Sequence, residues 1–244
     1  MITKQPFNLN AADSSWQRCL EEALKQLDPT YLDTLYHSSD WLPGQNSIFN
    51  AFSLPVNQTQ YILFGESPYP RAASANGYAF WDAAVAQLWS ETGLSKQVNR
   101  ATSLRNIIKT LLVAEGLLPQ TNTSQTAIAN LDKNNLIQTN SELFNRLLQH
   151  GFLLLNATPV LRPKQVRQDA QAWQPFIHHV LDFILQQRPN VKLILLGNIA
   201  NTIDKLVPNH KIQKIYAEHP YNISFIKNQT MLDFFEPLHL LQRG

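Results

Sequence analysis

Four short apolar runs constrain the fold of this 244-residue chain more than any other feature of its sequence. They do not alternate with polar residues, which is typical of strands buried on both faces of a sheet. The runs cover residues 60–64, 151–156, 191–196 and 213–217. Segments with helical periodicity separate them, so the sequence predicts an α/β fold with a central four-stranded, mainly parallel sheet.

The helical segments are expected to cover both faces of that sheet, which gives three layers, α/β/α. They span residues 16–27, 103–115, 141–149, 173–187, 198–206 and 229–241. Ser103 and Ser141 are candidate N-caps, because a serine hydroxyl can accept from an unpaired N–H group of the first turn. Ser141 begins only a weak capping box, since Phe144 stands where Glu or Gln would reach back.

Length and composition favour a single domain over residues 1–244, because 44% apolar residues can bury a sizeable core. Residues 118–138, rich in Thr, Asn and Gln, are expected to form a long loop. Cys19 is the single cysteine, and no Cys/His cluster has zinc-ligand spacing. With no apolar stretch of signal-peptide or membrane-span length, we expect a cytoplasmic monomer with no cofactor, metal or membrane partner.

Polar residues follow each predicted strand, where open parallel sheets bind their ligands. Asn156 alone is more typical of a turn, and Tyr69 and Phe80 are more typical of a core. His219 is a candidate general acid or electrostatic stabiliser near neutral pH. The order of these residues along the chain favours a site at the carboxyl edge of the sheet.

These residues resemble the uracil-DNA glycosylase superfamily, in the branch whose first motif reads Gly-Gln-Asp-Pro-Tyr-His. The resemblance covers most of the chain and implies a DNA N-glycosylase that acts on uracil-containing single- or double-stranded DNA. The similar segments are Gly-Glu-Ser-Pro-Tyr-Pro at 65–70, Ala-Asn-Gly-Tyr-Ala-Phe at 75–80, Thr-Ser-Leu-Arg-Asn-Ile at 102–107, Gly-Phe-Leu-Leu-Leu-Asn at 151–156, Leu-Leu-Gly-Asn at 195–198 and His-Pro-Tyr-Asn-Ile-Ser at 219–224.

The resemblance implies a pocket for a flipped-out uracil. Phe80 would stack on the base, Asn156 would pair with its edge, and Tyr69 would stand against C5 and exclude a methyl group. Glu66 would lie beside the base and the sugar. His219 would stabilise the departing uracil anion at O2.

The resemblance also implies a set of DNA-contacting residues around that pocket. Ile223 would be the apolar wedge that fills the emptied base stack. The other implied contacts are Ser103, Arg105, Gly197, Asn198, Tyr221, Asn222 and Ser224. Basic residues in or beside these loops offer phosphate contacts, although scattered solubilising charges explain any single one equally well; they are Arg71, Arg100, Arg105, Lys109, Arg162, Lys164, Arg167 and Lys227.

The first motif departs from the family pattern at the residue that matters most for chemistry. Ser67 stands in the place of the family's water-orienting aspartate, and Pro70 in the place of its histidine. Losing a general base commonly costs roughly 10² to 10⁴ in rate. Two hypotheses follow: a glycosylase of reduced or altered activity in which Glu66 supplies the negative charge, or a catalytically inactive module that binds uracil, DNA or a protein partner.

Overall fold

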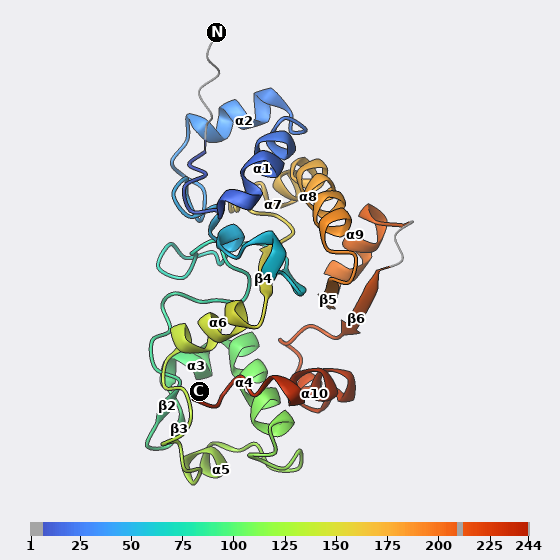
Figure 1. The fold of residues 1–244 in the computed structure, drawn as a ribbon. Helices are drawn as coiled ribbons and strands as arrows, with labels where there is room; N and C mark the ends of the chain where they lie inside the picture. Colours follow the sequence, from blue (N-terminus) through green and yellow to red (C-terminus); the bar gives the residue numbers. More distant parts are fainter. Residues whose placement is uncertain (1–6, 209–211, 244) are drawn as a thin grey trace.

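The computed structural model describes residues 7–208 and 212–243, and its centre is a sheet of four parallel strands (Figure 1). The strand order is β4-β1-β5-β6. The strands are β1 (Tyr61–Gly65), β4 (Phe152–Asn156), β5 (Lys192–Leu196) and β6 (Gln213–Ala217). All four predicted strands are present, and the predicted α/β class is confirmed.

Two hydrophobic clusters cover the two faces of the sheet. Ile62 and Phe64 of β1 contribute to a cluster with α1 (Gln17–Leu24) and α8 (Gln174–Gln187). Leu63 contributes to a cluster with α4 (Thr102–Ala114), α6 (Asn140–Gln149) and α10 (Gln229–Phe235). Successive side chains of a strand point to opposite faces, so one strand serves both clusters. Figure 1 shows these helices on the two sides of the sheet, which confirms the three-layer prediction.

The helices are short, and several were not expected from the sequence. Among the unexpected elements are α2, α3, α7 and a small hairpin of β2 (Trp89–Ser90) and β3 (Gly93–Leu94). The α-helices are α1 (Gln17–Leu24), α2 (Pro29–Tyr36), α3 (Lys96–Arg100), α4 (Thr102–Ala114), α5 (Gln125–Ala129), α6 (Asn140–Gln149), α7 (Val166–Ala172), α8 (Gln174–Gln187), α9 (Ile199–Leu206) and α10 (Gln229–Phe235). The 3-10 helices are η1 (Ser14–Trp16), η2 (Asn50–Ser53), η3 (Val56–Gln58), η4 (Ile223–Lys227) and η5 (Glu236–Leu238). None of the described helices is long and apolar enough to cross a membrane.

Both predicted N-caps are wrong. Helix α4 has Ala101 at its N-cap position and no side-chain cap there, so Ser103 already lies within the first turn. Helix α6 is capped by Thr139, which forms a capping box with Glu142. The sequence signal for that box, Thr-x-x-Glu, lies two residues before the expected position, and Ser141 is inside the helix.

Three further expectations need correction. The segment 118–138 is not a plain loop, because it contains α5, which buries Ile128. The last predicted helix ends at Phe235, since Pro237 and the left-handed His239 interrupt the α-helical pattern. Strand β6 lies at the edge of the sheet and is only partly buried, so its apolar composition overstated its burial.

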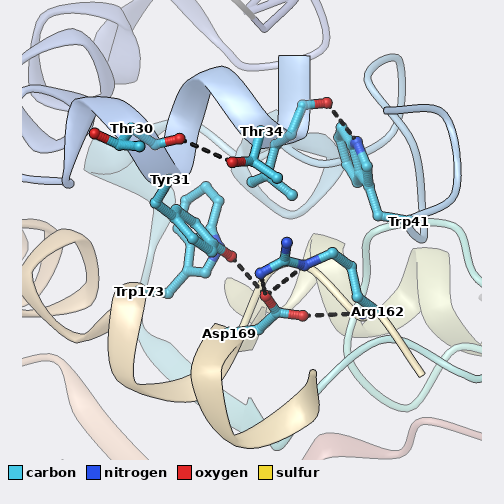
Figure 2. A network of polar contacts seen from close by, with 8 residues as sticks. Thr30, Tyr31, Thr34, Trp41, Arg162, Asp169 and Trp173 are labelled. Atoms are coloured by element: carbon cyan, nitrogen blue, oxygen red, sulfur yellow. Dashed lines mark hydrogen bonds and ion pairs between the residues drawn. The ribbon is translucent and has the colours of Figure 1, made fainter. Parts of the chain in front are cut away.

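A buried ion pair fixes the segment that leaves β4 (Figure 2). The Arg162 guanidinium donates to Asp169 Oδ1 through Nε at 2.8 Å and Nη2 at 2.5 Å, and the Arg162 backbone N–H donates to Oδ2 at 2.9 Å. Tyr31 donates its hydroxyl to the same carboxylate, and the Trp173 indole donates to Tyr31. The network joins the chain after Asn156 to α2 and α7.

We expect Asp169→Asn to lower the free energy of unfolding by about 3–5 kcal/mol, because it leaves the Arg162 charge buried without its partner. Urea denaturation of both proteins measures the difference. The control is Glu22→Gln, which breaks the exposed Arg18–Glu22 pair and should change stability little, because solvent and salt screen exposed pairs. Equal losses in the two variants would show that the buried network does not stabilise the fold in this way.

Candidate active site

The carboxyl ends of β1 and β4 meet at a position that only glycine can occupy. Gly65 pairs with Asn156 in the parallel register. A Cβ atom on Gly65 would lie 2.5 Å from Asn156 Oδ1 and 2.8 Å from the Ala79 Cβ. Real Cβ atoms essentially never approach so closely, so the missing side chain allows the buried Asn156 amide to sit beside β1.

Phe80 and Tyr69 lie next to this close approach. Ala79 donates its backbone N–H to Leu154 O at 3.0 Å, which holds the segment against β4. Phe80 has a φ of +63°, an uncommon conformation for a bulky residue, and its side chain is buried. Tyr69 donates its hydroxyl to Phe80 O at 3.1 Å. Burial raises the pKa of the Tyr69 phenol, so Tyr69 remains a hydrogen-bond donor at neutral pH.

His219 completes the cluster from the end of β6. Its ring centroid lies 5.9 Å from that of Phe80. Its Nδ1 atom accepts the backbone N–H of Tyr221 at 3.1 Å, so the neutral ring carries its proton on Nε2. Burial lowers the pKa of the His219 imidazole, while the Glu66 carboxylate opposes this by raising it. The result at neutral pH is an uncharged imidazole with Nε2–H available to a ligand.

A pocket of about 250 Å³ opens at this edge of the sheet. Glu66 and His219 both line it, close enough for the Glu66 carboxylate to act on the His219 imidazole, and Asn198 and Tyr221 share its wall. The remaining lining residues are Phe64, Leu196 and Ile199. The pocket therefore holds a carboxylate and a neutral imidazole, which suits a ligand that develops positive charge on one part and negative charge on another.

Gly197 allows the approach of His219 to β5. A Cβ atom there would lie 2.8 Å from the His219 Cβ, and the residue has a φ of +75°. The turn continues through Asn198 into α9. The structure thus brings together Gly65, Asn156, Phe80, Tyr69 and His219, with Glu66, Gly197 and Asn198 beside them, as the sequence predicts for the edge of the sheet.

The loop after His219 projects outward from this pocket. Tyr221 is 68% exposed and Ile223 is 77% exposed, and both are among the exposed large apolar side chains of the described residues. Asn222 and Ser224 are exposed as well. Ser224 and Asn228 donate to the Glu218 carboxylate, which closes the base of the loop.

Similarity to known proteins establishes the family of this chain. No protein-family model matches it. The crystal structure of UNG from Nitratifractor salsuginis is 40% identical, has a TM-score of 0.92, and the match covers 97% of this chain and 95% of that one. This chain belongs to the uracil-DNA glycosylase family. The uracil-DNA glycosylase of Lactococcus lactis subsp. cremoris is 29% identical over 90% of this chain and 83% of its own length.

A more distant structure supports the fold alone. The mimivirus uracil-DNA glycosylase is 16% identical with a TM-score of 0.60, over 88% of this chain and 72% of that one. The family resemblance seen in the sequence is confirmed, and with it the enzyme class of a DNA N-glycosylase.

The basic residues of this uracil-DNA glycosylase only partly match the predicted DNA-facing set. Arg162 is buried in its pair with Asp169, so its assignment to that set is wrong. Arg71 is paired with Asp82 at 3.1 Å. Arg105 donates to Asn99 O and contacts Asn106 Oδ1, and it therefore serves as an internal brace between α3 and α4. Ser103 lies half-buried in the first turn of α4.

Two further residues beside the candidate site were not predicted from the sequence. Asn106 is buried on α4 and donates to the backbone of the loop after His219. Glu218 holds the base of the same loop. A signal for Asn106 was present, because it is a polar residue among the apolar positions of an amphipathic helix. Among the described residues, no group of three or more His, Cys, Asp or Glu side chains could hold a metal ion.

We expect Glu66→Gln to lower the pKa of His219 further, because the carboxylate is the group that raises it against burial. A pH titration of the histidine ring signals by NMR measures the shift. Glu91→Gln, an exposed substitution in the β2–β3 hairpin, is the control and should leave the pKa unchanged. An unchanged or raised His219 pKa in Glu66→Gln would contradict the electrostatic link across the pocket.

Proposed function

We propose that this protein flips uracil out of DNA and hydrolyses its N-glycosidic bond, with neutral His219 stabilising the departing base. One observation carries the proposal: the Tyr221 N–H donates to His219 Nδ1 at 3.1 Å, which leaves Nε2–H as a fixed donor beside the Phe80 ring. A donor held in this way acts where charge develops on the base, without reorganisation during the reaction.

The chemistry requires opposite charges to be stabilised at two places. Cleavage passes through a sugar cation resembling an oxocarbenium ion and a uracil anion. The neutral His219 ring would donate through Nε2 to uracil O2, and its lowered pKa supports the uncharged form. Glu66 lines the same pocket and would supply negative charge near the sugar.

Base recognition would use the buried side of the cluster. Phe80 would stack on the flipped base, and the stacking helps to offset the cost of unstacking it, about a few kcal/mol. Asn156 would read the pyrimidine edge with its amide donor and acceptor. Tyr69 would stand against C5, held by its bond to Phe80 O, and would exclude thymine.

The hydrolytic water would be less well oriented than in a site with an aspartate. Ser67 is neutral and a poor base, so we propose that the activity is reduced and depends on Glu66. A separate role for Glu66 is supported by its place in the wall of the pocket, which Ser67, the next residue in the bend after β1, does not share. Glu66 would therefore act on the sugar from its own position beside His219.

DNA binding would use the exposed loops around the pocket. Ile223 would insert into the duplex as the apolar wedge, and Tyr221 would contact the flanking nucleotide. Ser103, the Gly197–Asn198 turn, Asn222 and Ser224 would contact the backbone, and such contacts give salt-sensitive affinity for single- and double-stranded DNA. We propose that the protein acts on DNA as a cytoplasmic monomer.

In the test, the protein is incubated with single- and double-stranded oligonucleotides that contain one uracil, and the products are then treated with alkali. We expect strand breakage at the uracil and none at a thymine in the same place. Ser67→Asp should raise the single-turnover rate, with Ser67→Ala as the control for the altered side chain. His219→Leu should lower the rate by about 10² to 10³, the usual effect of losing one such donor.

The outcomes that would contradict this proposal indicate different functions for the protein. No breakage at protein excess would overturn the proposed hydrolysis. If fluorescence anisotropy then shows uracil-selective binding, the protein is a damaged-base reader. If it shows no DNA affinity at low salt, the fold serves as a docking module for another protein.

A further inference from the structure

Asn106 reaches from the interior of the protein to three successive carbonyl groups of the loop that follows His219. It is 1% exposed and lies on the second turn of α4. Its Nδ2 atom lies 2.7 Å from Pro220 O, 3.4 Å from Tyr221 O and 3.3 Å from Asn222 O. The amide has two hydrogens to donate, and the bond to Pro220 O is the shortest of the three contacts.

Little else holds this part of the loop in place. Pro220 is buried, but the side chains from Tyr221 to Ser224 are exposed, so packing does little to fix the backbone between Pro220 and the buried Phe225. The Glu218 carboxylate holds only the base of the loop, through Ser224 and Asn228. Asn106, a buried polar side chain with several backbone partners, therefore anchors residues 220–222 from the interior, together with the buried Pro220.

The anchored backbone is the same one that sets the proton position on His219. The turn carries a bond from Asn222 N–H to His219 O at 2.9 Å, and Tyr221 N–H points at His219 Nδ1. Both bonds need residues 219–222 to keep this shape. Pro220 O and Tyr221 N–H belong to the same peptide group, so if Pro220 O loses its Asn106 donor, that peptide plane is less constrained and Tyr221 N–H no longer stays directed at Nδ1.

The amide of Asn106 is itself oriented by its neighbours. Its Oδ1 atom accepts from Arg105 Nε at 3.4 Å, and Arg105 Nη1 donates to Asn99 O at 3.1 Å. This leaves Nδ2 directed at the loop. The junction of α3 and α4, which carries Ser103, is thus connected through Arg105 and Asn106 to the histidine loop.

We propose that Asn106 is a positioning residue of this glycosylase, which fixes the Nε2–H tautomer of His219 by holding the backbone of residues 220–222. The proposal deepens the proposed function, in which that tautomer acts on the base. It assigns a role in the site to a side chain that touches neither DNA nor uracil.

The test combines a spectrum and a rate. In protein with ¹⁵N-labelled histidine, the wild type should show the His219 ring as a pure Nε2–H tautomer at neutral pH. Asn106→Leu keeps the branched shape of the side chain but has no donor, and it should shift the Nδ1 signal toward a mixture of tautomers. The kcat for uracil excision should fall on the order of 10²-fold, since small misplacements of a reacting group can cost that much.

Thr110→Val is the matched control. Thr110 is one turn further along the same buried face of α4, and its hydroxyl donates to Asn106 O and contacts Phe225 O. Its loss should reduce stability and leave the His219 tautomer and kcat unchanged. If Asn106→Leu fails to fold, Asn106→Ala, which cannot clash, is measured in the same way.

An Nε2–H tautomer that stays pure in the folded Asn106 variant would overturn the proposal, whatever happens to kcat. A tautomer mixture in Thr110→Val equal to that in the Asn106 variant would also overturn it, because the effect would then be general loosening. The spectrum needs no substrate, so it decides the role of Asn106 even if the wild type excises no uracil, an outcome that would overturn the proposed function alone.

Discussion

The site depends on the close approach of two side chains to glycines at the ends of neighbouring strands. Asn156 packs against Gly65 at the end of β1, and His219 packs against Gly197 just after β5. In each case a Cβ atom on the glycine would overlap with the approaching side chain. The parallel register places these strand ends at one edge of the sheet, and the missing side chains let an amide pack against β1 and an imidazole pack against the end of β5.

Around these contacts, the backbone does more to set the chemistry than charged side chains do. A single peptide N–H fixes the His219 proton, and a tyrosine hydroxyl ties the Phe80 backbone to the first motif. Burial lowers the pKa of the His219 imidazole and keeps the ring neutral, although the Glu66 carboxylate raises that pKa. The site thus works with few ionised groups, and the one carboxylate in its pocket has a defined electrostatic partner.

The strands and the strand-end residues could be predicted from the sequence because local composition determines them. A continuous apolar run that ends at Gly65 or Asn156 predicts both a buried strand and the place where that strand ends. Features that depend on tertiary contacts could not be predicted in this way. From the sequence, Arg162 is predicted to be a surface cation, and only the structure shows its pairing with Asp169. Ser103 is predicted to be a cap, but α4 begins one residue earlier, at Thr102. Asn106 was visible as a polar residue on an apolar helix face, but its partners are more than a hundred residues away.

Chemical-shift mapping with the free base tests whether the strand ends form a pocket for uracil. Adding uracil to ¹⁵N-labelled protein should shift the Asn156 side-chain amide, the Phe80 backbone and the His219 ring, with Nδ1 remaining the acceptor from Tyr221. Thymine at the same concentration should shift none of them, because its methyl group meets Tyr69. Equal shifts with both bases, or shifts only outside this edge of the sheet, would contradict the account.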